Sequence, residues 1–160
     1  MRKQEKIIED LKLFSPTQDG DWSDFTKLME ELWTTRNPQN GYRTLFELLV
    51  KYDDDYMECQ WDIIHGMEHS GEYESELVDS LRTKPVDLTL TMLSRLINSG
   101  RKEIANTSIE MLLDQILERK DSNEELKRLA QDCRTRLKAT EKAKSKFGTT
   151  SNGTQQCVAI

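Results

Sequence analysis

Apolar residues recur at three- and four-residue intervals along most of this chain, in short runs separated by turn-forming residues. In the run from 86 to 99, apolar side chains cover most of a helix circumference, which is typical of a helix packed between neighbours. Three prolines and seven glycines among 160 residues are too few for the tight turns of an all-β chain. The pattern predicts an all-α fold of about eight consecutive antiparallel helices joined by short turns.

The expected helices follow one another closely. Each combines an apolar stripe at helical spacing with turn or capping signals at its ends. They occupy residues 2–14, 21–33, 42–52, 53–69, 73–81, 86–99, 104–117 and 122–142. From the third helix onward, consecutive pairs span roughly 30–40 residues, near the period of helical-hairpin repeats. No signature recurs between these pairs, so an α-solenoid-like stack of helical hairpins and an irregular bundle both remain open.

The apolar pattern stops at about residue 142. A chain of this length suffices for one domain with a sizeable core. Residues 148–156 are all small or polar, which is typical of a disordered tail. We therefore expect a single helical domain at 1–142 and a disordered C-terminal tail at 143–160.

The cysteines and the apolar runs favour the cytoplasm as the compartment. Cys59, Cys133 and Cys157 are odd in number and far apart, unlike a disulfide framework. Four of residues 1–6 are charged, and they lead into an amphipathic segment without the apolar core of a signal peptide. No apolar run approaches the ~20 residues needed to cross a bilayer, so we expect no membrane insertion.

Residues 52–81, which we call the acidic segment, carry charge of one sign only. The segment contains no Lys or Arg and ten acids: Asp53, Asp54, Asp55, Glu58, Asp62, Glu68, Glu72, Glu74, Glu76 and Asp79. An exposed helix normally intersperses Lys among its acids, because i,i+4 pairs of opposite charge stabilise it. We interpret the segment as a surface that binds a basic partner. The plainer alternatives are a solvated surface and, for Asp53 to Asp55, carboxylates at the positive end of a helix dipole.

One helix of the acidic segment is expected to separate a buried stripe from a polar one. The buried stripe would consist of Tyr56, Met57, Trp61, Ile64 and Met67. Glu58, Asp62, His65 and His69 follow at steps of four, three and four, which places them on one polar face. Together with the neighbouring acids they give our candidate partner-binding residues: Asp53, Asp54, Asp55, Glu58, Asp62, His65, His69, Glu72, Glu74 and Glu76.

The two histidines also raise the question of metal chemistry. Residues 65–69, HGMEH, match the H-x-x-E-H motif of one zinc protease class. The chain has no third histidine, so zinc would need a distant carboxylate as a further ligand. Any Ser or Cys triad would also depend on His65 or His69, and no Gly-rich phosphate loop occurs. We expect no catalytic residues, no metal and no cofactor, and we keep a metal-dependent hydrolase as the least favoured alternative.

The charge of the chain is distributed unevenly. Residues 1–120 contain 15 basic and 24 acidic side chains, a net charge of −9. Nucleic acid needs a Lys/Arg footprint for its phosphates, so direct nucleic-acid binding is not expected. An acidic body instead attracts positively charged proteins.

The last four residues, Cys157-Val158-Ala159-Ile160, fit a C-a-a-X prenylation box. Lysines precede it, at 138, 142, 144 and 146. In a eukaryotic cytosol this sequence would be a substrate for lipid attachment. Otherwise Cys157 is an ordinary thiol in the tail.

Spaced aromatic and leucine positions carry a resemblance to a known group of proteins. They lie in residues 57–68, MECQWDIIHGME, then at Tyr73, Leu77 and Leu81, and in residues 93–100, LSRLINSG. Over about residues 20–120 the chain resembles the small helical immunity proteins of bacterial polymorphic-toxin and contact-dependent growth inhibition systems. The resemblance implies a cytoplasmic antitoxin without enzymatic activity that binds and neutralises one cognate toxin domain. With the acidic segment, it suggests a basic toxin domain such as a nuclease as the partner. The alternative, from another functional class, is a helical adaptor or scaffold protein, prenylated at Cys157.

Overall fold

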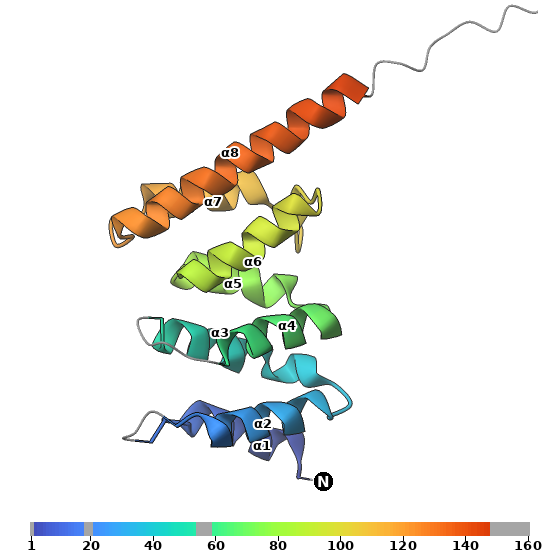
Figure 1. The fold of residues 1–160 in the computed structure, drawn as a ribbon, viewed down its shortest axis with the longest axis vertical. Helices are drawn as coiled ribbons and strands as arrows, with labels where there is room; N and C mark the ends of the chain where they lie inside the picture. The colour runs from blue at the N-terminus through green and yellow to red at the C-terminus, as the bar shows by residue number, and fades with distance from the viewer. Residues whose placement is uncertain (1, 18–20, 54–58, 148–160) are drawn as a thin grey trace, which may run out of the picture.

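The computed structural model describes residues 2–17, 21–53 and 59–147, and this part of the chain is almost entirely helical (Figure 1). Its elements are α1 (Gln4–Leu13), α2 (Ser23–Trp33), the 3-10 turn η1 (Pro38–Gly41), α3 (Tyr42–Lys51), α4 (Gln60–Ser70), α5 (Glu74–Thr83), α6 (Asp87–Asn98), β1 (Glu103–Ile104), β2 (Thr107–Ser108), α7 (Ile109–Glu118) and α8 (Glu124–Phe147). The all-α prediction is confirmed. In this part of the chain no helix is both long and apolar enough to cross a membrane.

The helices form a stack of four hairpins in two layers. Each odd-numbered helix packs against the even-numbered helix that follows it, and α1, α3, α5 and α7 contact one another in sequence. We call these four the odd layer, and α2, α4, α6 and α8 the even layer. The hairpins follow one another along the long axis of the molecule (Figure 1). The odd helices begin 38, 32 and 35 residues apart, so of the two expected architectures the chain adopts the solenoid-like one.

The two edges of the stack carry different turns, because consecutive helices run in opposite directions. One edge, which we call the outer-turn edge, holds the turns that lead from one hairpin to the next, including residues 71–73 and 99–108. The opposite edge holds the turns within hairpins, including residues 84–86 and 119–123. Every described residue with positive φ belongs to the outer-turn edge: Gly71, Glu72, Gly100, Ala105 and Asn106.

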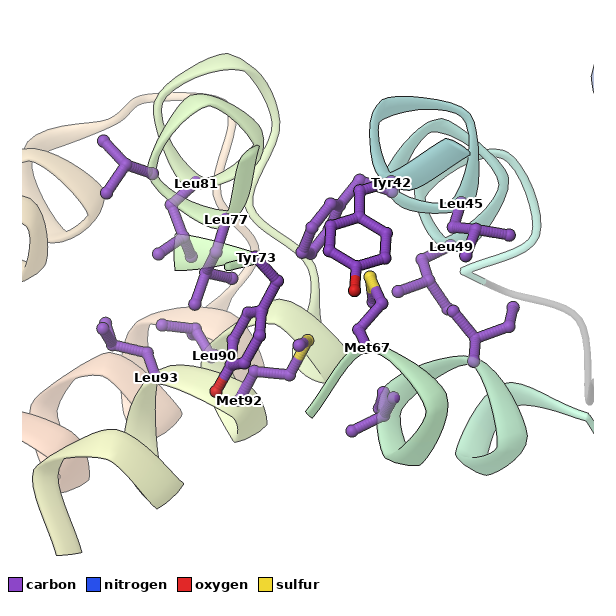
Figure 2. Close-up of a cluster of buried hydrophobic side chains, with 14 of the residues drawn as sticks. Tyr42, Leu45, Leu49, Met67, Tyr73, Leu77, Leu81, Leu90, Met92 and Leu93 are labelled. Carbon is purple, nitrogen blue, oxygen red and sulfur yellow. The ribbon is translucent and has the colours of Figure 1, made fainter. Parts of the chain in front are cut away.

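A single buried cluster extends through the stack, from Ile7 in α1 to Leu137 in α8. Figure 2 shows its central part, where Tyr42, Leu45 and Leu49 of α3 lie with Met67 of α4. Tyr73, just before α5, and Leu77 of α5 lie with Leu90, Met92 and Leu93 of α6 in the same view. The Tyr42 hydroxyl donates a hydrogen bond of 3.0 Å to the Gly71 carbonyl, which joins the start of α3 to the turn before α5. Neighbouring hairpins are therefore held together by shared apolar contacts and by this bond.

Two helix starts differ from the prediction. The fourth helix was expected from residue 53, but α3 ends in a turn at Tyr52 and α4 begins at Gln60. Tyr52 is held at that turn because its ring packs edge-on against Trp22 and its hydroxyl donates to the Phe14 carbonyl. The seventh helix was expected from residue 104, but residues 103–108 form a two-stranded hairpin and α7 begins at Ile109. Ser108 caps it by accepting a hydrogen bond from the Met111 amide.

The C-terminal helix is longer than expected. It continues to Phe147, five residues past the predicted end of the domain at 142. The remainder of the expected tail, 148–160, which includes Cys157, lies outside the described residues.

The stack predicts a large difference between two leucines at helical positions. Leu113 is fully buried in α7, whereas Leu13, the last residue of α1, is 74% exposed. Leu113→Ala should lower the free energy of unfolding by about 2–5 kcal/mol, because it removes buried methyl groups and leaves a cavity. Leu13→Ala, the matched control, should change it by less than about 0.5 kcal/mol. Urea unfolding followed by circular dichroism measures both, and equal effects would contradict the packing of α7.

Candidate functional site

The exposed side of α4 carries the polar stripe that the spacing predicted. Asp62, His65 and His69 are all exposed, as expected. The opposite side of the helix, formed by Ile63, Ile64 and Met67, is buried against the rest of the stack. Glu58, the fourth member of the predicted stripe, lies outside the described residues, as do Tyr56 and Met57.

Trp61 was predicted to be buried, and this prediction is wrong. Its side chain is 46% exposed, and its ring centroid lies 5.9 Å from that of His65 on the next turn. The buried side of α4 is centred between Ile63, Ile64 and Met67, so position 61 falls at its border. The adjacent pair Ile63-Ile64 was the sequence signal for this shift of the buried stripe. We call Trp61, Asp62, His65 and His69 the α4 face.

Contacts on both flanks fix the orientation of α4. On one flank Gly66 lies against Trp33 of α2, so closely that an added Cβ would be 2.3 Å from the indole ring. On the other flank Glu68 accepts a charged hydrogen bond of 2.8 Å from Arg95 of α6. The Glu68 side chain is only 20% exposed, so water screens this pair less than a pair on the surface. The orientation of α4, and with it the α4 face, is thus set by contacts with two other helices, α2 and α6.

Arginines from other parts of the chain neutralise part of the acidic segment. Glu74 pairs with Arg101 at 3.5 Å. Arg43 of α3 pairs with Glu76 at 3.3 Å and with Asp79 at 3.6 Å. The segment itself has no basic residues, but the fold brings arginines from outside it next to some of its acids. Spacing along the chain does not reveal these pairs. Glu74 and Glu76, two of the candidate residues, already have internal partners.

The remaining candidates are spread over the stack. Asp53 precedes α4 and Glu72 follows it, so they lie at opposite ends of a helix about 16 Å long. Both are exposed, and Glu72 adopts a left-handed backbone conformation with φ of 61°. Asp54 and Asp55 lie outside the described residues. The described candidates therefore do not form one acidic patch, and the α4 face is the part of the set that is brought together.

The described residues contain no group of three or more His, Cys, Asp or Glu side chains placed to hold a metal ion. Two of the cysteines, Cys59 and Cys133, are buried and form no disulfide. Burial raises the pKa of the Cys133 thiol, and this effect is larger than the opposite effect of its hydrogen bond with Ser94, which lowers the pKa. A raised pKa leaves little of the nucleophilic thiolate at neutral pH.

Tyr73 lies at the start of α5, in the turn that follows α4. Burial raises its pKa to about 12, and the nearby carboxylates of Glu68 and Glu74 contribute in the same direction. The phenol is therefore neutral at physiological pH. The turn depends on the neutral form, since an ionised Tyr73 would be a buried anion beside two acids.

Comparisons of the chain with protein-family models, with curated proteins and with solved structures give no match. The function has to be inferred from the chemistry of the exposed surfaces.

The contact between Gly66 and Trp33 gives a test of how α4 is held. In Gly66→Ala the new methyl group would overlap the indole, which we expect to lower the free energy of unfolding by about 1–3 kcal/mol. This loss opposes the roughly 1 kcal/mol that alanine gains over glycine in a helix. In a Trp33→Leu background the same change should be neutral or stabilising, because the ring is gone. Urea unfolding of the four proteins would contradict this packing if Gly66→Ala had the same effect in both backgrounds.

The raised pKa of Tyr73 gives a prediction for alkaline pH. The folded state keeps its proton up to about pH 12, whereas the unfolded chain loses it near pH 10. Stability contributed by the neutral phenol is therefore complete below pH 10 and is lost as the pH rises towards 12. Over this range the stability of the native protein relative to Tyr73→Phe should fall by up to about 2–3 kcal/mol. A difference that stays constant from pH 9 to pH 12 would contradict the burial of Tyr73.

Proposed function

We propose that this protein is a non-enzymatic immunity protein, which acts in the cytoplasm by binding one toxin domain through the α4 face. One observation carries the proposal: a half-exposed tryptophan, a carboxylate and two imidazoles lie together on a helix that both neighbours hold in place. Tryptophan is enriched among residues that dominate binding energy at protein interfaces. A helix face that is already formed before binding limits the entropy lost on binding.

The charge of the chain supports a basic partner. With a net charge of −9 over residues 1–120, the body attracts positively charged proteins and raises their rate of association. A toxin that acts on nucleic acid needs a basic cleft for phosphates, which an acidic surface can occupy. Since Glu74 and Glu76 already bind arginines, we expect Asp62 and Glu72 to provide the acidic contacts among the described residues.

The resemblance of residues 57–68 and 93–100 to helical immunity proteins adds to the proposal. The alternative is an adaptor or scaffold. The stacked hairpins favour this alternative, because such stacks present extended binding surfaces. The mass of the purified protein separates the two. A prenyl group on Cys157 favours the adaptor.

The test uses two double variants that match in position and chemistry. Trp61→Ala/Asp62→Lys alters an exposed apolar residue and an acid in the first turn of α4. Glu110→Lys/Met111→Ala makes the equivalent change in the first turn of α7, where Met111 is 53% exposed. Each protein is co-expressed with a candidate toxin domain, and the purified pair is studied by calorimetry.

The α4 variant should fail to protect cells and should bind the toxin domain at least about 30-fold more weakly, as expected for loss of a binding hot spot. The α7 variant should protect and bind like the native protein. Circular dichroism shows whether both variants remain folded. Native affinity of the folded α4 variant would rule out the α4 face as the binding site.

A further inference from the structure

A groove lies in the odd layer, between α3 and α5. Its volume is about 370 Å³, within the range of about 300–1,000 Å³ typical of small-ligand pockets. The residues that line it are Arg43, Phe46, Glu47, Val50, Glu76, Asp79, Ser80, Thr83 and Lys84. No residue of α4 lines the groove, so it is separate from the α4 face.

The charges along the groove are predominantly negative. Glu47, Glu76 and Asp79 contribute three carboxylates, against the cations of Arg43 and Lys84. Arg43 bridges Glu76 and Asp79 across the groove at 3.3 and 3.6 Å. These carboxylates, Glu76 first, raise the pKa of the Arg43 guanidinium. The groove thus already holds one guanidinium that belongs to the chain itself.

This internal guanidinium is held weakly. The Arg43 side chain is 66% exposed, and exposed ion pairs contribute little to stability because water and salt screen them. It can therefore move aside at small cost when a second cation arrives.

The floor of the groove suits the methylene stem of a long cationic side chain. Phe46 is buried and Val50 is half-buried between the polar residues of the rim. The Ser80 hydroxyl, on the α5 side, is inaccessible to water and has no hydrogen-bond partner among the described residues. A ligand on the floor of the groove would therefore contact the apolar groups and the carboxylates of the rim rather than this hydroxyl.

We propose that this groove binds an arginine side chain from a segment of another protein. Its methylene groups would pack on Phe46 and Val50, and its guanidinium would replace that of Arg43 between Glu76 and Asp79. Arginine fits better than lysine, because its planar guanidinium bonds two carboxylates at once, and it is less strongly hydrated. The site is independent of the α4 face and goes beyond toxin binding.

The test uses n-butylguanidinium, which has the stem and head group of arginine, and n-butylurea as its neutral isostere. Each is titrated into the isotopically labelled full chain, and amide resonances are followed by NMR. The guanidinium should give saturable shifts in α3 and α5, with a dissociation constant of about 1–10 mM. The urea should give none at the same concentrations. Equal binding of both probes, or no saturable shifts in α3 and α5, would overturn the proposal.

Three variants then test whether the guanidinium binds between the two carboxylates, in the place of Arg43. Glu76→Gln/Asp79→Asn should weaken binding of the guanidinium about two- to fivefold for each carboxylate removed. Arg43→Gln should strengthen binding about two- to fivefold, because it removes the competing cation. Glu110→Gln in α7, an exposed acid outside the groove, is the control and should leave binding unchanged. Weaker binding by Arg43→Gln would overturn the proposal, because it would mean that Arg43 holds the ligand.

Discussion

The burial of α3 is the constraint on which the rest of the stack depends. Six of its ten residues are buried, and the helix contacts α1, α4, α5 and η1. Full burial of a leucine-sized side chain contributes about 1.5–3 kcal/mol, so Leu45 and Leu49 are stabilised only while all of these neighbours remain in place. A single hairpin cannot cover the apolar sides of its own helices. The hairpin that contains α3 therefore requires the hairpins before and after it, which explains why the core is continuous.

The helices could be predicted from sequence because their signal is local. Apolar spacing identified all eight, and the choice between a stack and a bundle needed only the contacts among the odd helices. The start of α4 was missed because Tyr52 is held at the end of α3 by a tertiary contact with Trp22. The hairpin before α7 was missed because its turn depends on a positive φ at Asn106. The same limit applies to the α4 face. Three of its members were predicted, but the exposure of Trp61 depends on how α4 is rotated against α3.

Charge was harder to interpret than hydrophobicity. Ten acids within the acidic segment, with no Lys or Arg among them, suggested one binding surface. In the structure, however, three arginines from outside the segment pair with some of these acids: Arg43, Arg95 and Arg101. Helical periodicity reveals only neighbours three or four positions away along the chain. Arg43 and Glu76, by contrast, are 33 residues apart, and Arg101 and Glu74 are 27 residues apart. The acids of the segment therefore have different roles. Some hold the helices together, whereas Asp62 remains on an outward face, away from the groove between α3 and α5.

The length of α8 has a mechanical consequence. Its last described buried residue is Leu137, and the helix continues for ten more residues, about 15 Å, beyond it. In Figure 1 this end of α8 projects beyond the other helices. The projecting part is a helical arm. The direction of the arm is set by the buried residues that pack α8 on α6 and α7: Leu126, Ala130, Cys133 and Leu137. A small rotation of α8 against these two helices would therefore move the tip of the arm farther than it moves the packed part of the helix.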